Sequence, residues 1–579
     1  MAFSRYVVVL ALVAGCLLPS GVQALWPIPT TLETGMTTLK ISPAFYFDVQ
    51  IEGAPPDLCD AVAQSQYYLE NDKLGRLVVG RGANDTTALA SAMTLSKLTL
   101  ALASGATVGS ISSEAVKPLG TRSEEYALMI PADGSAATLT ANTTLGLYRG
   151  LTTFNQLFYY YGGVTYTSIA PIAIRDTPAY PFRGLALDTS RNYYPVSDIL
   201  RTLDAMSWVK INTFHWHITD SQSFPLEVAQ YPELAINGAY SPQEVYTASD
   251  VQHIVQYAAA RGIDVMMEID TPGHTAIIAA TYPEYVACFD ARPWADFANE
   301  PPAGQLRFAL PEVMNFTASL LTNVAKTLPS YYFSTGGDEL NTNCYANDYL
   351  TQRQLNSTGM TLNGALDTFT QTTHGALIAQ GKTPVVWEEM VLNWNITLSN
   401  ETIVMIWISS ADAAAVAGRG FRIIQAPSNY FYLDCGAGEW LGDDPTGNSW
   451  CDPFKTWSEA YTFDPLANLT EAQYKLVLGG KHNLVSRYID LSEQSTGEQL
   501  LWSEQSGPQN VDPIVWPRAA SSAEIFWSGK QPTGAALNVT EALPRLHDVR
   551  YRMVQRGVNA IPLQPHWCAL RPDACDLYA

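Results

Sequence analysis

The feature that most constrains this chain is a change of pattern after Phe182, where short apolar segments begin to alternate with helical ones. Such alternation predicts parallel βαβ units, because parallel strands need a crossover between them. Helical stretches include 197–209, 248–261, 316–328 and 362–380. We predict eight strands, near 184–188, 213–218, 264–269, 331–334, 384–387, 403–408, 422–425 and 499–502. Eight units favour a (β/α)8 TIM barrel with long loops. An open doubly wound sheet is the alternative, but no GxGxxG follows a strand.

Residues 25–175 have a different pattern and predict a smaller N-terminal α+β domain. Strand-like segments lie at 39–51, 77–79 and 126–130, and residues 145–159 carry apolar side chains at helical spacing. Three prolines between Pro171 and Pro181 predict a linker. We therefore expect a leader at 1–24, the α+β domain at 25–175 and a catalytic barrel at 180–579.

The leader has the pattern of a secretory signal peptide. Arg5 precedes an apolar run from Tyr6 to Pro19, and Val22-Gln23-Ala24 fits a cleavage site. The run is shorter than the ~20 residues of a spanning helix, so a signal anchor is the weaker reading. We predict a secreted protein.

Charge and cysteine usage agree with secretion. A net charge of −22 and a pI near 4.7 make nucleic acid or an anionic membrane unsuitable as a partner. Without a CxxC pair there is no sign of a zinc knuckle or redox motif. We expect the pairs Cys568–Cys575, Cys435–Cys451 and Cys288–Cys344, which leaves Cys59 unpaired. Eight N-x-S/T sequons predict a glycoprotein: Asn84, Asn142, Asn315, Asn356, Asn395, Asn400, Asn468 and Asn538.

Acidic and aromatic residues recur where the predicted barrel strands end, which is where the active site of this fold is built. Carboxylates can protonate a glycosidic oxygen, and tryptophan faces stack on sugars, so the combination indicates carbohydrate chemistry. The Gly336-Gly337 pair would let a substrate approach the backbone beside the acids. The strand ends carry Asp188, His217 to Asp220, Glu268 to Asp270 with His274, Asp338-Glu339, Trp387-Glu388-Glu389, Trp407, Tyr432 to Asp434, and Trp502-Ser503-Glu504.

Several of these segments, in order, resemble the β-N-acetylhexosaminidases of glycoside hydrolase family 20, in their secreted filamentous-fungal form. The resemblance covers most of residues 126–530 and implies a (β/α)8 barrel behind an α+β domain, with a pro-segment near the N-terminus. The segments are FRGLALDTSRNYYP, NTFHWHITDSQSFPLE, MEIDTPGHT, YYFSTGGDEL, VVWEE, YLDCGAG, WCDPFKTW, LLWSEQ and WPRAASSAEIFW.

The resemblance implies a role for each residue at a matching position. Glu339 is implied as general acid/base, Asp338 as the partner of the substrate's 2-acetamido group, and Tyr432 as donor to the acetamido oxygen. The other implied site residues are Arg183, Glu504 and Asp434 at ring hydroxyls, Trp387, Trp407 and Trp502 around the −1 sugar, and Asp220 and His274 behind the acidic pair. The expected substrates are oligosaccharides that contain N-acetylhexosamine; no cofactor is expected, and a homodimer is a family-level expectation.

Adjacent residues cannot easily flank a glycosidic bond from opposite faces, so Asp338 is a poor nucleophile to pair with Glu339. Substrate-assisted catalysis, in which the acetamido oxygen attacks the anomeric carbon, removes that need. We therefore expect an exo-acting, retaining enzyme that releases terminal N-acetylhexosamine. The alternatives are a lacto-N-biosidase-like specificity and an inactive carbohydrate-binding protein.

Three features fit less well. His215 and His217 share a strand face, but no third ligand accompanies them, so we predict no metal. Glu388 and Glu389 are interpreted as rim charges. Residues 481–497 interrupt the approach to the last strand, and a retained intron is our hypothesis for them.

Overall fold

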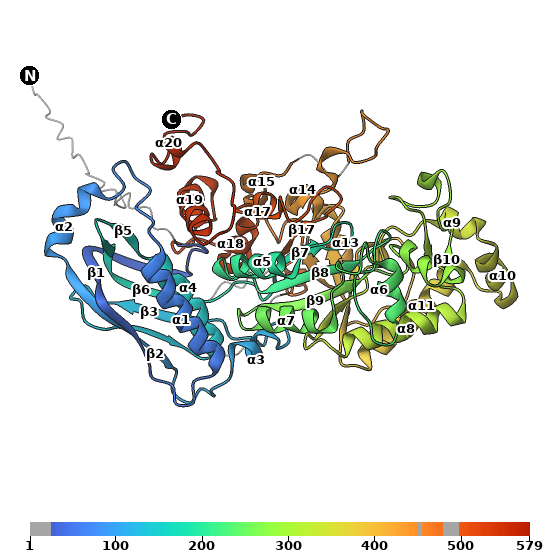
Figure 1. Cartoon of the computed structure of the whole chain (residues 1–579), viewed down its shortest axis with the longest axis horizontal. Helices are drawn as coiled ribbons and strands as arrows, with labels where there is room; N and C mark the ends of the chain where they lie inside the picture. The colour runs from blue at the N-terminus through green and yellow to red at the C-terminus, as the bar shows by residue number, and fades with distance from the viewer. Residues whose placement is uncertain (1–24, 450, 452–453, 479–496) are drawn as a thin grey trace, which may run out of the picture.

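The computed structural model describes residues 25–449, 451, 454–478 and 497–579 (Figure 1). Eight parallel strands close into a barrel, because β15 pairs with β17 and β17 in turn pairs with β7. They are β7 (Arg183–Asp188), β8 (Thr213–Thr219), β9 (Asp264–Ile269), β12 (Tyr332–Ser334), β13 (Thr383–Trp387), β14 (Ile403–Ile406), β15 (Arg422–Gln425) and β17 (Gly497–Leu501). Each overlaps a predicted segment, so the predicted TIM barrel is confirmed.

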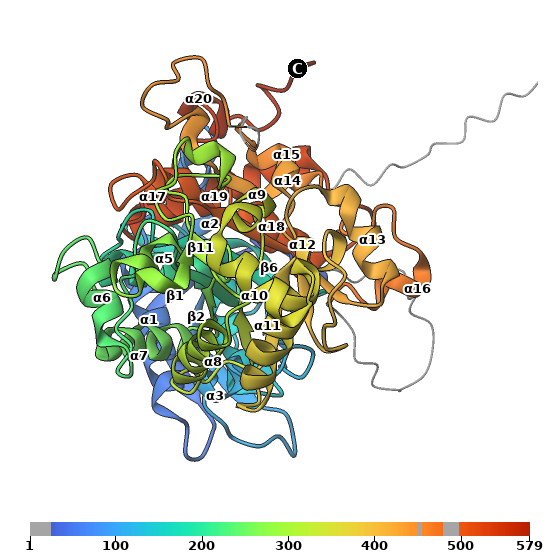
Figure 2. The ribbon, with the colours of Figure 1, turned by 90° about the vertical axis from the view of Figure 1, so that its right-hand side faces the viewer.

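Helices surround this barrel, which is why its strands read as continuous apolar runs. Every residue of β8 and β9 is buried. The longer helices are α5 (Val196–Trp208), α7 (Ala248–Ala259), α8 (Pro311–Ala325), α11 (Leu362–Ile378), α18 (Ala520–Ser528) and α19 (Val539–Gln555). Seen end-on, α8 and α11 lie with α10 (Tyr349–Thr358) on the side away from the N-terminus (Figure 2).

Shorter elements shape the rim. β16 (Tyr432–Asp434) pairs with β17 beyond the barrel, and β10 (Val286–Ala287) forms a small hairpin with β11 (Gln305–Leu306). The short helices are α6 (Pro232–Gly238), α9 (Thr342–Asn347), α12 (Glu389–Leu392), α13 (Ala413–Gly418), α14 (Ser428–Phe431), α15 (Trp457–Tyr461), α16 (Glu471–Tyr474), α17 (Val511–Val515) and α20 (His566–Ala569).

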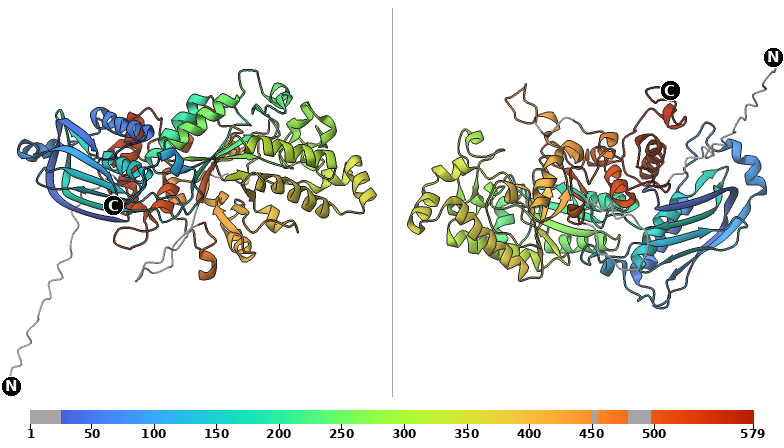
Figure 3. Two further views of the ribbon diagram at one scale, coloured as in Figure 1. Left: turned by 90° about the horizontal axis from the view of Figure 1, so that it is seen from below. Right: turned by 180° about the vertical axis from the view of Figure 1, so that it is seen from behind.

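A six-stranded sheet in the order β1-β2-β4-β3-β6-β5 precedes the barrel. Helix α4 packs on one face toward the barrel. In the view from behind, none of the described helices lies over the opposite face (Figure 3). The elements are β1 (Thr31–Val49), α1 (Pro56–Asn71), α2 (Thr86–Ser91), β2 (Met93–Leu102), α3 (Ile111–Ala115), β3 (Tyr126–Ile130), β4 (Ala137–Ala141), α4 (Thr144–Gln156), β5 (Tyr159–Tyr161) and β6 (Val164–Asp176).

Two predictions for this region are wrong. Residues 77–79 form turns, not a strand. The predicted linker begins too early, because β6 continues through Pro171 to Asp176 and pairs with β1 and β3. Proline is tolerated there because Pro171 is not needed as a ladder donor. The domain boundaries themselves remain a prediction, and the leader at 1–24 lies outside the described residues, as does 481–496.

The prediction for Arg183 is also wrong, because Arg183 begins β7 and so lies at the end of the barrel opposite the strand ends. Its guanidinium is fully buried and binds Glu124 with Nη2, at 2.8 and 2.6 Å. Glu124 also accepts from Arg149 of α4 at 2.8 Å. Burial would raise the pKa of Glu124, but the two arginines lower it to about 2. This carboxylate therefore joins the N-terminal sheet to the barrel floor.

A second buried ion pair lies beside the first. Lys210 Nζ is 2.8 Å from Asp176 Oδ2, and Trp527 donates its indole N–H to the same carboxylate at 3.0 Å. Asp176 ends β6, Lys210 precedes β8 and Trp527 lies in α18. The two domains thus share a polar floor in which each buried charge has a partner.

The predicted disulfides are confirmed: Cys288–Cys344, Cys435–Cys451 and Cys568–Cys575. Cys59 is the free cysteine among the described residues, and it is exposed. Within the same ranges, none of the helices has the length and apolar character needed to cross a bilayer.

We predict that Glu124→Ala lowers the free energy of unfolding by about 3–5 kcal/mol, because it leaves Arg149 and Arg183 buried without their counterion. Denaturant unfolding measures this. The matched control is Glu125→Ala, at the exposed neighbouring position, which should change stability by less than about 0.5 kcal/mol. Equal effects of the two substitutions would contradict the account of the floor.

Candidate active site

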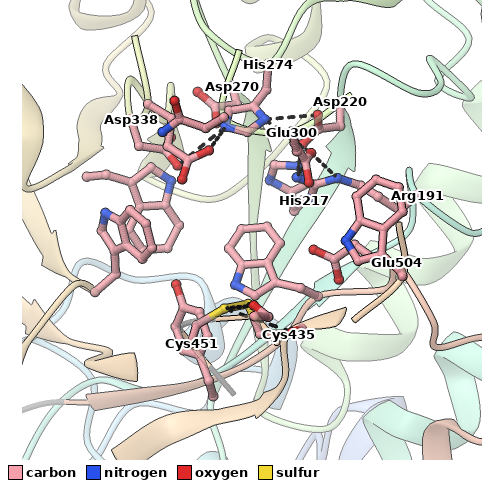
Figure 4. A pocket seen from close by; sticks show the side chains of 18 residues that line it. Arg191, His217, Asp220, Asp270, His274, Glu300, Asp338, Cys435, Cys451 and Glu504 are labelled. Carbon is pink, nitrogen blue, oxygen red and sulfur yellow. Dashed lines mark hydrogen bonds and ion pairs between the residues drawn. A yellow bond between two sulfur atoms is a disulfide. The ribbon is translucent and has the colours of Figure 1, made fainter. Parts of the chain in front are cut away.

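A pocket opens at the carboxyl ends of the barrel strands (Figure 4). Nine of the eleven predicted site residues line it: Asp220, His274, Asp338, Glu339, Trp387, Trp407, Tyr432, Trp502 and Glu504. Arg183 and Asp434 do not. The further lining residues are Arg191, His217, Asp270, Asn299, Glu300, Cys435, Trp440, Ser449 and Cys451.

The acidic pair follows a turn that requires two glycines. Gly336 and Gly337 both have positive φ, at 61° and 96°. A Cβ on Gly336 would lie 2.0 Å from the Asp270 carboxylate, and the Gly337 N–H donates to that carboxylate at 2.8 Å. Gly336 therefore makes room for Asp270, and a Cβ on Gly337 would lie 2.6 Å from Met390. The predicted approach of a substrate to this backbone stays a prediction. Glu339 itself is at φ 55°, a strained value for a residue with a side chain.

Asp338 is a buried carboxyl that faces other acids. Burial and the nearby Asp270 raise its pKa well above the usual range, while His274 opposes the rise. Its Oδ1 atom is buried and has no hydrogen-bond partner among the described residues. A protein seldom leaves such an atom unsatisfied, so it marks a place for a ligand's donor.

His274 supplies positive charge to this group. Its Nδ1 lies 3.1 Å from Asp220, and its Nε2 lies 3.7 Å from Asp338 and 3.4 Å from Glu339. Burial would lower the pKa of His274, but Asp220, Asp270 and Glu300 raise it well above the usual range. Asp220 stays ionised: burial would raise its pKa, and Arg191 and His274 lower it well below the usual value.

Aromatic side chains form the other wall. The rings of Trp407 and Tyr432 are nearly parallel, with centroids 6.2 Å apart at 12°. Trp387 contacts both Trp407 and Trp502, at 6.5 and 6.2 Å between centroids. Burial raises the pKa of Tyr432 well above 10, so its hydroxyl keeps its proton and can donate.

Glu389 is more than a rim charge. It is buried and accepts from the Trp407 indole at 2.8 Å. Burial raises its pKa to about 7, with the hydrogen bond from Trp407 opposing the rise. Its neighbour Glu388 is buried too and accepts from the Ile408 N–H at 3.1 Å. Both glutamates thus hold the loop that carries Trp407.

Arg191 occupies the position predicted for Arg183. It lies 3.2 Å from Asp188 and 3.0 Å from Asp220, and its guanidinium stacks 5.2 Å from the centroid of Trp502. The sequence contains a usable signal for Arg191. Arg191 follows the end of the first barrel strand, which is where site residues belong, whereas Arg183 begins that strand.

Glu504 lies beside Arg191 in the pocket (Figure 4). Burial raises its pKa to about 8, although Arg191 opposes the rise, and its Oε2 has no partner among the described residues. A carboxyl in this state can donate to one sugar hydroxyl and accept from another. Asp434, in contrast, accepts from Ser506 at 2.6 Å and from the Ala437 N–H at 3.1 Å, so it holds the loop after β16.

Two family models match the chain. Residues 180–530 match the catalytic domain of glycosyl hydrolase family 20, and residues 25–157 match the model described as beta-acetyl hexosaminidase like. The chain belongs to glycosyl hydrolase family 20. Its activity is that of an exo-acting β-N-acetylhexosaminidase.

Individual relatives are similar over most of the chain. It is 35% identical to a beta-hexosaminidase of Arthroderma benhamiae, over 78% of this chain and 74% of that one. It is 33% identical to a chitooligosaccharidolytic beta-N-acetylglucosaminidase of Bombyx mori, over 78% and 74%. In fold it is similar to the family 20 exo beta-N-acetylglucosaminidase of Vibrio harveyi, with a TM-score of 0.71, 21% identity, and coverage of 93% and 78%.

Some residues of this family 20 site carried no usable sequence signal. Glu300 and Asn299 lie in the loop between β10 and β11, and Trp440 lies beyond β16. Each comes from an irregular segment, so no strand end marks it. Asp270 and His217 do lie at strand ends, but the family resemblance implies no role for them in the site.

We predict that Arg191→Lys mainly lowers activity and that Arg183→Lys mainly lowers stability. Lysine has one point charge where arginine has a fork of donors, so Arg191→Lys should lower kcat/KM about 10- to 100-fold, the worth of a charged hydrogen bond. Arg183→Lys should lower the melting temperature and leave kcat/KM of the folded enzyme within about twofold.

Steady-state kinetics and thermal unfolding of both variants measure this. A loss of kcat/KM confined to Arg183→Lys would show that the pocket has been assigned to the wrong arginine.

Proposed function

We propose that this β-N-acetylhexosaminidase releases terminal β-linked GlcNAc, and GalNAc as well, from chito-oligosaccharides and glycoconjugates. The name of the Bombyx mori relative supports chito-oligosaccharides as substrates. A cavity of about 170 Å³ with acids on one side and aromatic rings on the other suits a single terminal sugar. The aromatic rings offer apolar faces to the ring, and Arg191 and Glu504 offer polar groups to its hydroxyls.

We propose further that the reaction retains configuration and that the substrate's acetamido oxygen is the nucleophile. The observation that carries this is that one nitrogen, Nε2 of His274, lies within 4.0 Å of both Asp338 and Glu339. The two carboxyl groups therefore face the same side of the pocket. A double displacement by two enzyme carboxylates needs them on opposite sides of the anomeric carbon.

Each pocket group then has a task. Glu339 protonates the glycosidic oxygen as the bond breaks. The Tyr432 hydroxyl donates to the acetamido oxygen and directs it toward the anomeric carbon. Asp338 accepts from the acetamido N–H with its unpartnered Oδ1.

The attraction between Asp338 and the acetamido group is strongest in the transition state. As the oxazolinium ion forms, positive charge develops on the acetamido nitrogen beside Asp338. Asp338 accepts as a carboxylate, so no proton has to leave it, and the burial that raises its pKa also strengthens its attraction to that charge. Water then opens the oxazolinium ion at the anomeric carbon, with Glu339 as general base.

We also propose that the protein is secreted and N-glycosylated. The three disulfides fit an oxidising compartment. All eight sequon asparagines are exposed in the structure, as glycan attachment requires.

We predict that Glu339→Gln lowers kcat about 10²–10⁴-fold for substrates with poor leaving groups, because the amide keeps the shape of the side chain but cannot give a proton. Chitobiose measures the full loss. An aryl glycoside with an acidic phenol should lose less, since that phenolate leaves unaided.

The comparison between the two substrates is the test. Equal losses would show that Glu339 is not the general acid, and hydrolysis with inversion, seen as the α-anomer by NMR at early times, would exclude the substrate-assisted route.

A further inference from the structure

A row of alternating carboxylates and imidazoles runs through the barrel interior to the acidic pair. Neighbouring oxygen and nitrogen atoms in the row are 2.6–3.1 Å apart. Five of the six side chains are buried, and His274 is partly exposed at the pocket. His217, Asp220 and His274 are visible at the pocket end (Figure 4). In order, the row is Glu498, His215, Glu268, His217, Asp220 and His274.

The strands account for this order. His215 and His217 are two residues apart on β8, so both side chains point into the barrel. Glu268 on β9 pairs in register with His217. Its two oxygens bind the two histidines separately, Oε2 to His215 at 3.1 Å and Oε1 to His217 at 2.6 Å.

His217 must therefore be doubly protonated. Its Nδ1 faces Glu268 at 2.6 Å and its Nε2 faces Asp220 at 2.8 Å. A neutral imidazole has one donor only, so it would leave one carboxylate facing a lone pair. The pKa agrees: burial would lower it, but Asp220 and Glu268 raise it to about 9.

The contact with His217 is one of those that orient Asp220. Oδ2 of Asp220 accepts a hydrogen bond from His217, and Arg191 lies 3.0 Å from the same oxygen. Oδ1 accepts from the Ser221 backbone N–H and lies 3.1 Å from Nδ1 of His274. The ring of His217 also packs edge-on against Trp502, with centroids 5.0 Å apart at 82°, which restricts its rotation.

We propose that His217 is a positioning residue for the reaction: held by Glu268, it fixes the Asp220 carboxylate so that His274 is held against Asp338 and Glu339. The inference rests on the proposed function, since Asp338 and Glu339 are taken as the reacting groups. His217 donates to Asp220 and acts through it, without itself exchanging a proton with the substrate. Its charge also helps to balance the acids around it: Glu268 and Asp220.

The test compares His217→Phe with His215→Phe in the full-length protein. Both substitutions remove a buried imidazole from Glu268, but only the first removes the contact with Asp220. His217→Phe should lower kcat about 10- to 100-fold with KM within about threefold, as expected when the reacting groups are misplaced. His215→Phe should lower the melting temperature and leave kcat within about threefold.

The pH profile of kcat/KM separates positioning from simple stability. Loss of the His217 charge favours the protonated form of Asp338, so the limbs of the profile should move to higher pH by about 0.5 unit or more. His215→Phe, being farther away, should move them by less than half as much. Unchanged limbs and kcat with a lower melting temperature would show that His217 is only structural. Equal shifts in the two variants would also overturn the proposal.

A measurement on the unaltered protein keeps the proposal testable if His217→Phe does not fold. In ¹⁵N-histidine NMR at pH 7.5, His217, assigned with the milder His217→Gln variant, should give two protonated ring nitrogens. A neutral His217 would overturn the proposal. Activity that survives Glu339→Gln would instead count against the proposed function and would leave this NMR result unaffected.

Discussion

The crowding of acids around one buried pocket is the constraint on which the rest of the site depends. Arg191, His217 and His274 supply positive charge to this pocket. Six carboxyl groups line it: Asp220, Asp270, Glu300, Asp338, Glu339 and Glu504. Like charges so close in a low dielectric cannot all ionise. The cations select which do, since Asp220 and Glu300 are held ionised while burial raises the pKa of Asp338, Asp270 and Glu504. Three acids thus have raised pKa values, and Asp338 is the one that lies beside the proposed positive charge.

The opposite end of the barrel also buries charged side chains, but there their role is structural. Glu124 accepts from two buried arginines, Arg149 and Arg183. Asp176 accepts from the buried Lys210 and from the Trp527 indole, so both carboxylates are occupied by partners within the protein. The contrast with the pocket is informative: Asp338 and Glu504 each keep a buried oxygen without a partner among the described residues. The paired charges join the two domains, and the two pocket acids are those that we propose to bind substrate.

The sequence predicts the barrel well because parallel strands covered by helices are apolar along their whole length. It predicts the N-terminal sheet poorly, because β2 and β4 alternate exposed and buried residues over short spans and give no continuous signal. Nine of the predicted site residues line the pocket, and their places at strand ends and in the family motifs predict them. The prediction for Arg183 is wrong because a residue that begins a barrel strand lies at the end of the barrel opposite the pocket. Glu300 is not predicted because it reaches the pocket from an irregular loop.

The central claim is that the substrate's own acetamido oxygen is the nucleophile, and a series of fluoroacetyl substrates tests it most directly. Each fluorine withdraws electrons from the carbonyl oxygen and barely changes its size. The account predicts that kcat/KM falls progressively from acetyl to mono-, di- and trifluoroacetyl glycosides. A flat series, together with a sugar ester trapped on Asp338 or Glu339, would contradict it and make an enzyme carboxylate the nucleophile.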